Sequence, residues 1–185
     1  MQEERGLSEL SDERVNVYID GSNLYHLLRG RYGRADLDFL AFARKLVGQR
    51  RLQRIYYYTA PIDQSRQPGP YQSQQRFFQH LGHIRQLELR LGRLVYPRGR
   101  NNPPHEKGVD VKLATDMVLH GVRNNFDVAI LVSTDTDFYD ALSLLRDFDL
   151  KAEVALVNLS GSKALQEIAD RIIHINAAFL EGCWR

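Results

Sequence analysis

Carboxylates directly follow two apolar segments that lie far apart in the chain. Residues 15–19 and 128–132 are rich in Val and Ile, and they lead into Asp20 and into Asp135 and Asp137. Apolar runs of this kind, followed at once by helix-starting residues, are typical of parallel strands covered by helices on both faces. Ligands of an open α/β sheet bind at the carboxyl ends of its strands, where these acids are expected. Hard oxygen ligands favour Mg²⁺ or Mn²⁺, so the pattern predicts metal-dependent phosphate chemistry.

A further acidic residue belongs to a helix predicted over residues 109–122. At about 100° per residue, Asp110 falls inside the apolar sector of this helix, so its carboxylate is expected to point toward the crevice. An inward carboxylate needs a partner, and a cation shared with Asp20 and Asp135 would provide one. The alternative is that Asp110 only interacts with the helix dipole, without any metal. Asp116 falls at the margin of the apolar sector. It is expected either to contact the residues that hold the acids or to be exposed to solvent.

Asp137 and three uncharged or basic side chains complete the predicted site. Asp137 lies two residues beyond Asp135, where it either binds a second ion or orients water, or else caps the helix that begins near Phe138. Asn23 and Ser133 are expected to hold a carboxylate or a phosphate oxygen, unless they serve only an N-cap and a turn. Lys107 precedes a helix N-terminus that should face the crevice, which is a suitable place for a phosphate, unless it is an ordinary surface lysine. Because grouped carboxylates repel one another and raise each other's pKa values, such a cluster makes sense mainly as a cation site.

Charge is segregated along the 185 residues. Residues 29–100 contain fifteen Lys and Arg but four Asp and Glu, so this block carries +11 while the remainder carries −9. Twenty of the 25 basic residues are Arg, whose planar guanidinium matches phosphate in a two-point fork. The block therefore suits a polyanionic substrate, with a solvated helical face as the alternative. Arg98 and Arg100 lie in a Pro- and Asn-rich segment, residues 97–107, which is predicted to be irregular, basic and able to close over a substrate.

Strand and helix signals alternate along the chain. Strands are predicted at residues 15–20, 52–59, 94–96, 128–132 and 152–157, with a weaker sixth at 172–175. Helices are predicted at residues 22–28 with Ser22 as N-cap, 37–47 with Asp36 as N-cap, 71–91, 109–122, 138–146 and 163–169. This alternation predicts a three-layer α/β/α sandwich with a mainly parallel, doubly wound sheet. The most economical strand order, 3-2-1-4-5 plus the possible sixth strand, places Asp20 opposite Asp135 where the winding reverses.

Length and composition favour one domain. With 43% hydrophobic residues, the chain can form one sizeable core, expected over residues 15–185 after a polar N-terminal tail at 1–14. No segment has the apolar length of a signal peptide or a membrane span, so a cytoplasmic protein without membrane contact is expected. The single cysteine, Cys183, excludes an internal disulfide and a Cys-based metal site. A homodimer is left open.

Three motifs, taken together, resemble the NYN domain, specifically its LabA-like branch within the PIN-like nucleases. They are IDGSN at residues 19–23, KGVDVKLATD at 107–116 and STDTDF at 133–138, and their order and context match over roughly residues 15–157. One departure concerns Thr134 and Thr136, because such sequences often have smaller residues there. The threonines still permit the turn but add bulk beside the acids.

The resemblance implies a PIN-like α/β/α sandwich and metal-dependent cleavage of RNA. It also implies an acidic cluster that consists of Asp20, Asp110, Asp135 and Asp137. Asn23 and Asp116 match positions that are typical of the family.

Two functions follow from these observations. The first is an endoribonuclease that uses Mg²⁺ or Mn²⁺ on RNA, in the simplest case single-stranded, which Arg98, Arg100 and the basic block would hold. The second is a non-catalytic RNA-binding or regulatory protein whose acids bind a structural ion. A phosphatase or nucleotide-binding domain is less favoured, because no Gly-rich phosphate loop and no Asp-x-Asp motif follow the first strand. Tyr56, Tyr57, Tyr58 and Tyr71 either stack on bases or, for the first three, fill the strand core.

Overall fold

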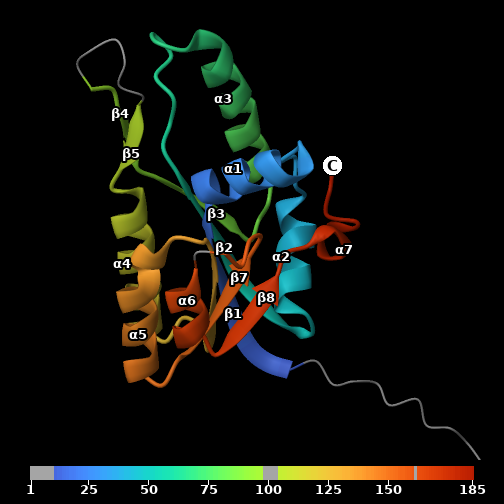
Figure 1. Ribbon diagram of the computed structural model, residues 1–185, viewed down its shortest axis with the longest axis vertical. Helices are drawn as coiled ribbons and strands as arrows, with labels where there is room; N and C mark the ends of the chain where they lie inside the picture. The colour runs from blue at the N-terminus through green and yellow to red at the C-terminus, as the bar shows by residue number, and fades with distance from the viewer. Residues whose placement is uncertain (1–10, 98–103, 161) are drawn as a thin grey trace, which may run out of the picture.

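Six parallel strands form a sheet at the centre of the protein, in the order β3-β2-β1-β6-β7-β8 (Figure 1). The computed structural model describes residues 11–97, 104–160 and 162–185. The strands are β1 (Ser11–Asp20), β2 (Arg50–Thr59), β3 (Leu87–Leu91), β6 (Val128–Val132), β7 (Lys151–Leu156) and β8 (Arg171–His174). The predicted doubly wound sheet, including its sixth strand, is confirmed. The winding direction reverses between β1 and β6.

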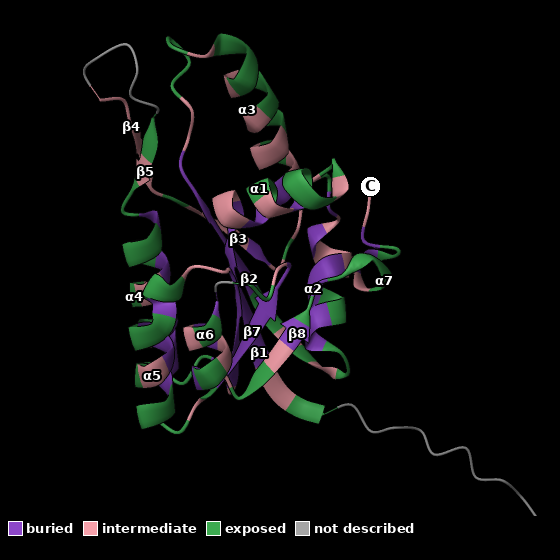
Figure 2. Ribbon diagram, in the orientation of Figure 1, coloured by how far each residue is buried: buried purple, intermediate pink, exposed green. Residues whose placement is uncertain are grey.

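Helices cover both faces of this sheet (Figures 1 and 2). One face carries α1 (Gly21–Tyr32), α2 (Phe39–Val47), α3 (Pro68–Gly82) and α7 (Ala177–Leu180). The other face carries α4 (Val109–Val122), α5 (Tyr139–Asp147) and α6 (Lys163–Ile168), with the 3-10 helix η1 (Thr136–Phe138) leading into α5. Each face has its own hydrophobic cluster, because successive strand residues point to opposite sides. In β1, for example, Val17 packs with the first set of helices and Tyr18 with the second.

The third strand of the sheet differs from the prediction. One helix was expected to run to residue 91, but α3 ends at Gly82 and residues 87–91 form β3. The sequence LELRL alternates apolar and charged residues, as a strand requires, yet its leucines also continue a helical pattern. Residues 93–95 form β4, which pairs antiparallel with β5 (His105–Lys107) outside the main sheet. Part of the segment that was expected to be irregular is therefore ordered by a non-local pairing.

Two helices begin at different residues than expected. Asp20, rather than Ser22, is the N-cap of α1, because Asp20 Oδ1 accepts a hydrogen bond of 3.1 Å from the backbone N–H of Asn23. Asp38, rather than Asp36, caps α2 and accepts two backbone N–H groups at 3.0 Å. In both cases the predicted N-cap was wrong because two residues that can cap a helix lie two positions apart in the sequence.

A buried ion pair joins two strands away from the acids. Arg50, the first residue of β2, donates from Nη1 and Nη2 to the Glu153 carboxylate at 2.6 and 2.9 Å. Glu153 in β7 is 5% exposed, and Arg171 Nη1 lies 3.8 Å from it. Arg50 belongs to the basic block of residues 29–100, so that block is not one continuous surface for a polyanion. The charge of Arg50 is paired inside the fold and does not contribute to such a surface.

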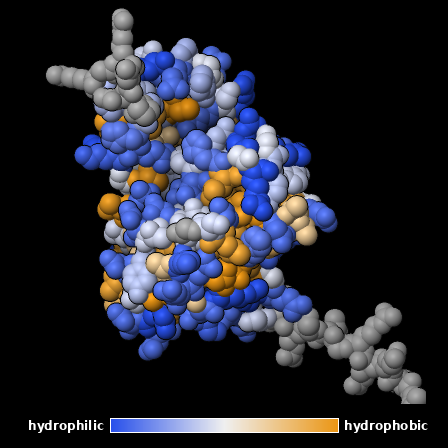
Figure 3. Space-filling model, viewed as in Figure 1, coloured by the Kyte–Doolittle hydropathy of each residue, from blue (hydrophilic) through white to orange (hydrophobic). Residues whose placement is uncertain are grey.

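The molecular face seen in Figure 3 is mainly hydrophilic, and hydrophobic residues gather there over β7 and β8. Among the described residues, no helix combines the length and the apolar character needed to cross a membrane.

Candidate active site

Asp20 ends β1 at the point where the sheet reverses its winding. Its side chain is buried, at 5% exposure, and both carboxylate oxygens have partners. Oδ1 accepts the backbone N–H of Asn23, and Oδ2 accepts the Ser133 hydroxyl at 3.0 Å. The same hydroxyl accepts the backbone N–H of Asp135 at 3.1 Å. One serine thus links the acid that ends β1 to the turn after β6, where the strand order predicted that the two would meet.

The turn after β6 carries Asp135 and Asp137 and is held to α1 by Asn23. Asn23 Oδ1 accepts the backbone N–H of Thr134 at 3.1 Å, and Asn23 Nδ2 donates to Thr134 Oγ1 at 3.2 Å. Asp135 Oδ1 accepts the backbone N–H of Asp137 at 3.0 Å, which makes Asp135 the N-cap of η1. Asp135 is half-buried and Asp137 is exposed, so both carboxylates are available at this edge.

Asp110 lies in the first turn of α4 and is exposed, although an inward position was expected. The turn into α4 is made by Gly108 at a φ of 76°, a left-handed conformation that suits glycine. The pKa of Asp110 is raised, first because neighbouring atoms displace part of its hydration and then because Asp135, Glu106 and Asp137 add negative charge nearby. Asp110 is therefore electrostatically coupled to the two acids of the β6 turn.

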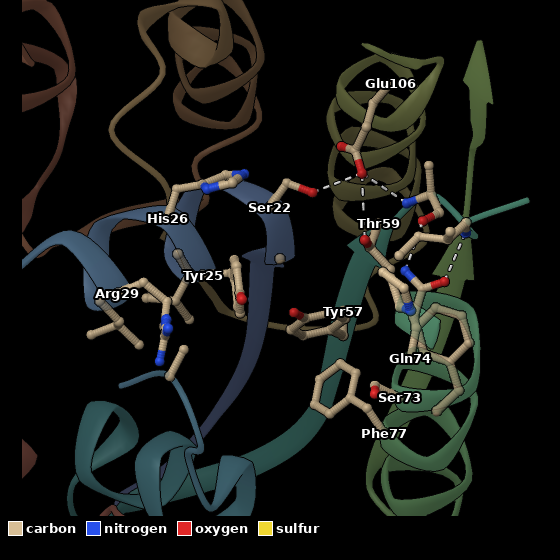
Figure 4. Close-up of a pocket in the computed structure, with 18 of the residues that line it drawn as sticks. Ser22, Tyr25, His26, Arg29, Tyr57, Thr59, Ser73, Gln74, Phe77 and Glu106 are labelled. Carbon is tan, nitrogen blue, oxygen red and sulfur yellow. Dashed lines mark hydrogen bonds between the residues drawn. The ribbon is translucent and has the colours of Figure 1, made fainter. Parts of the chain in front are cut away.

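Glu106 in β5 is a fifth acid, which the sequence analysis missed. Its Oε1 accepts the Ser22 hydroxyl at 2.7 Å, the backbone N–H of Ala60 at 2.9 Å and, more weakly, the Thr59 hydroxyl at 3.4 Å (Figure 4). Its charge contributes to the raised pKa values of Asp20 and Asp110. A signal was available, because Glu106 directly precedes the second family-like motif, but the surrounding segment was expected to be irregular.

The pKa of Asp20 is raised to about 6. Burial is the main cause, the hydrogen bonds from Asn23 and Ser133 oppose it, and the charges of Asp110 and Glu106 add to it. Carboxylates that raise each other's pKa gain stability from a proton or from a bound cation. The electrostatics of this edge therefore favour cation binding.

The five acids do not form a closed metal cage. Within residues 11–97, 104–160 and 162–185, no three His, Cys, Asp or Glu side chains lie close enough together to hold a metal ion. The chemistry of the donor set nevertheless fits a hard divalent cation, because Asp20, Asp110, Asp135, Asp137 and Glu106 offer only anionic oxygens. Burial and, to a lesser extent, neighbouring negative charge raise the pKa values of Asp20 and Asp110, and a bound cation would offset both effects.

Two of the predicted site residues have structural partners instead. Asp116 Oδ2 accepts the Tyr58 hydroxyl at 3.1 Å and Arg90 Nε at 3.0 Å, so Asp116 forms an ion pair with β3 away from the acids. Ser133 was expected to hold a carboxylate or a phosphate oxygen, or to serve only a turn. It is 2% exposed, and its hydroxyl donates to the Asp20 carboxylate and accepts the backbone N–H of Asp135, so in this structure it holds the acids.

The predicted basic residues are placed only in part. Lys107 is exposed in β5, immediately before Gly108 and α4. Arg98 and Arg100 lie outside the described residues. Tyr56, Tyr57 and Tyr58 are at most 7% exposed, so they fill the sheet core as the alternation of strand residues suggested.

Comparison with known proteins identifies the family. Residues 14–176 match the model of the NYN domain. A crystal structure of a protein of unknown function from Vibrio parahaemolyticus is similar, with a TM-score of 0.69 and 22% identity over 92% of this chain and 98% of that one. At this identity the similarity supports the fold alone, and no curated protein matches the sequence. With most of its length matched, this chain belongs to the NYN domain family, which is part of the PIN-like nuclease superfamily.

Proposed function

We propose that this protein is a metal-dependent endoribonuclease that hydrolyses phosphodiester bonds in RNA, in the simplest case single-stranded RNA. The observation that carries the proposal is the Ser133 bridge, which joins Asp20 to the backbone of Asp135 at one edge of the sheet in an NYN domain. The three family-like motifs further favour the LabA-like branch of that family. Mg²⁺ or Mn²⁺ is the proposed cofactor.

Asp20, Asp110, Asp135 and Asp137 would hold the cation, and we add Glu106 to this set. PIN-like nuclease domains usually use divalent metals, and this set consists only of carboxylates. When bound, the cation would neutralise charge on the phosphate and increase the acidity of water. The protein itself supplies the positions of the acids, through the hydrogen bonds of Ser133 and the clamp between Asn23 and Thr134.

The proposed phosphate contacts lie at the start of α4. Gly108 provides no side-chain cap to this helix, so backbone N–H groups of its first turn are without a side-chain partner among the described residues and would bind an anion. Lys107 is exposed next to them and would add a point charge. Arg98 and Arg100, in the intervening segment, are proposed to contact the RNA backbone. Removing either charge should then weaken binding and reduce its salt dependence by about one unit of slope.

A second candidate function is supported by the geometry of the acids. Since no three potential ligands are preassembled among the described residues, the same carboxylates would also suit a non-catalytic RNA-binding or regulatory protein. In that case the cation would stabilise the fold or a bound partner. Binding without cleavage is the behaviour that separates this candidate from a nuclease.

The proposal is tested by incubating the protein with end-labelled single-stranded RNA and with DNA of the same sequence. The reactions should contain Mn²⁺, Mg²⁺ or EDTA. Metal-dependent cleavage of RNA in preference to DNA is the expected result. Binding of RNA without cleavage under any metal would favour the second candidate, and cleavage in EDTA would exclude the proposed cofactor.

A further inference from the structure

A pocket of about 720 Å³ lies between α1, the end of β2 and α3 (Figure 4). This volume is in the range of sites that bind small organic groups. Glu106 and Ser22, which hydrogen-bond to each other, form part of its wall. Gly21 also lines the pocket and directly follows Asp20 in the chain, so the pocket adjoins the acidic edge.

Aromatic side chains line the pocket from two helices. Tyr25 and His26 of α1 lie on one side, and Phe77 and Phe78 of α3 lie on the other. Phe77 meets the ring of Tyr57 edge to face, with ring centroids 5.5 Å apart at 72°. Tyr25 keeps half of its surface exposed, so its ring is accessible to a ligand. Flat aromatic faces of this kind bind nucleobases by stacking, largely independently of base identity.

Tyr57 provides a polar group among these rings. Its side chain is 5% exposed, and its hydroxyl has no hydrogen-bond partner within the described part of the chain. The ring packs so tightly on the start of α1 that a Cβ at Gly21 would clash with it. Because this hydroxyl is not completely enclosed by protein atoms, it is open to the pocket that Tyr57 lines and is available for the polar edge of a ligand. Figure 4 shows Tyr57 between the residues of α1 and those of α3.

Positive charge stands at the α1 side of the pocket. Arg29 lines it there and is exposed, with one guanidinium N–H bound to the carbonyl of Gly33. Arg34 also lines the pocket, but its guanidinium is paired with Asp36, another lining residue. The pocket thus combines stacking surfaces, a tyrosine hydroxyl and the guanidinium of Arg29. A base attached to a sugar-phosphate backbone has matching features.

We propose that this pocket binds an unpaired nucleobase of the polynucleotide whose phosphate lies at the acidic edge. The inference rests on the proposed function and deepens it, because a base held within a duplex could not enter the pocket. It makes single-stranded RNA the substrate class. The base stacks between the aromatic residues of α1 and α3, and the backbone passes Glu106 toward the acids.

The test fills the pocket without touching the acids. Ser73 is exposed and lines the pocket from α3, so Ser73→Phe places a ring in the space that the base would occupy. Gln72→Phe is the matched control, because Gln72 is the exposed neighbouring residue and does not line the pocket. The probe is a short fluorescent single-stranded RNA, compared with versions in which one base at a time is replaced by an abasic site. Binding is measured by anisotropy in Mg²⁺ and in EDTA.

Loss of one stacked base should weaken binding roughly tenfold. We expect this loss for Ser73→Phe and for one abasic position in the wild type, with no further loss when the two are combined. Gln72→Phe should bind like the wild type. If the wild type binds and cleaves RNA but Ser73→Phe and every abasic RNA bind equally well, the pocket inference is wrong and the proposed function stands. If the wild type neither binds nor cleaves RNA, both are wrong.

Discussion

The Ser133 hydroxyl donates a hydrogen bond of 3.0 Å to Asp20 Oδ2, across the boundary between β6 and β1. β1 and β6 are far apart in the sequence and become neighbours where the winding of the sheet reverses. The hydrogen bond between Ser133 and Asp20 therefore forms only when the sheet is assembled. Since the same hydroxyl accepts the backbone N–H of Asp135, the positions of the two acids depend on each other.

Ser133→Ala should impair the acidic site more than the fold. Removing the hydroxyl leaves Asp20 buried with one partner fewer, so we expect a loss of about 1 to 2 kcal/mol in the free energy of unfolding. Cleavage should fall about tenfold, because Asp20 and Asp135 are no longer coupled. Ser162→Ala is the control, since Ser162 is also buried but its hydroxyl bonds the Leu159 carbonyl instead. Equal activity of the two variants would show that the bridge has no catalytic importance.

Asp20 should make the metal-free protein less stable as the pH rises. Its pKa is about 6 in the folded state and 3.8 ordinarily, so the folded state holds the proton more tightly. The resulting stability is fully present below about pH 4 and is lost as the pH rises through about 6. A shift of this size corresponds to about 3 kcal/mol. Asp20→Asn cannot lose this contribution, and its neutral side chain still caps α1.

The measurement is urea unfolding of the wild type and Asp20→Asn in EDTA, from about pH 4 to about pH 7. The stability of the wild type relative to the variant should decrease over this range. Saturating Mn²⁺ should reverse the trend, because the cation binds the ionised carboxylate. A difference that is independent of pH would mean that burial does not perturb Asp20.

Asp116 should contribute to stability rather than to cleavage. It matches a typical position of the family, but its carboxylate accepts hydrogen bonds from Tyr58 and Arg90. Asp116→Asn removes the charge opposite Arg90 and should cost about 1 kcal/mol of stability. Its cleavage rate should stay within about threefold of the wild type, whereas that of Asp135→Asn should fall at least a hundredfold. A comparable loss of cleavage in both variants would place Asp116 in the catalytic machinery.

The pair of Arg50 and Glu153 should contribute strongly to stability and nothing to function. Arg50→Met leaves the buried Glu153 with only Arg171, at 3.8 Å, and should cost about 3 kcal/mol. Lys151→Met is the control, because Lys151 is exposed and its ion pair with Glu13 should contribute little. Thermal unfolding checks both variants. A loss for Arg50→Met no larger than that for Lys151→Met would show that the buried pair is not needed.

The central strands could be predicted because their sequence has one physical explanation. Residues 128–132 are apolar on both faces and residues 15–19 are apolar except for Asn16, and both runs are short and rich in β-branched residues, as in covered parallel strands. The order of these strands predicted where the winding of the sheet reverses. That position in turn predicted that Asp20 would lie beside the turn that carries Asp135. β3 could not be separated from α3 in the same way, because its leucines fit both periods and only pairing with β2 decides between them.

The site was predicted less completely than the fold, for two reasons. Glu106 lies near the acids because β5 pairs with the preceding strand β4, and residues 105–107 carry no strand pattern of their own that would have predicted this pairing. The roles of Ser133 and Asp116 depend on their burial and on their hydrogen-bond partners. Neither can be predicted from the spacing of residues in a motif. Position in a motif therefore indicated which residues to consider, whereas the three-dimensional structure separated those at the acidic edge from those that stabilise the core.

The central claim is tested most directly by cleavage of labelled single-stranded RNA by the wild type and Asp20→Asn, in Mn²⁺, Mg²⁺ and EDTA, with RNA binding measured for both proteins. We predict cleavage by the wild type that requires the metal and is lost in Asp20→Asn, while both proteins bind RNA and remain folded. Tight binding by the wild type without cleavage in either metal would contradict the account, and the acids would then hold an ion or a partner in a regulatory RNA-binding protein.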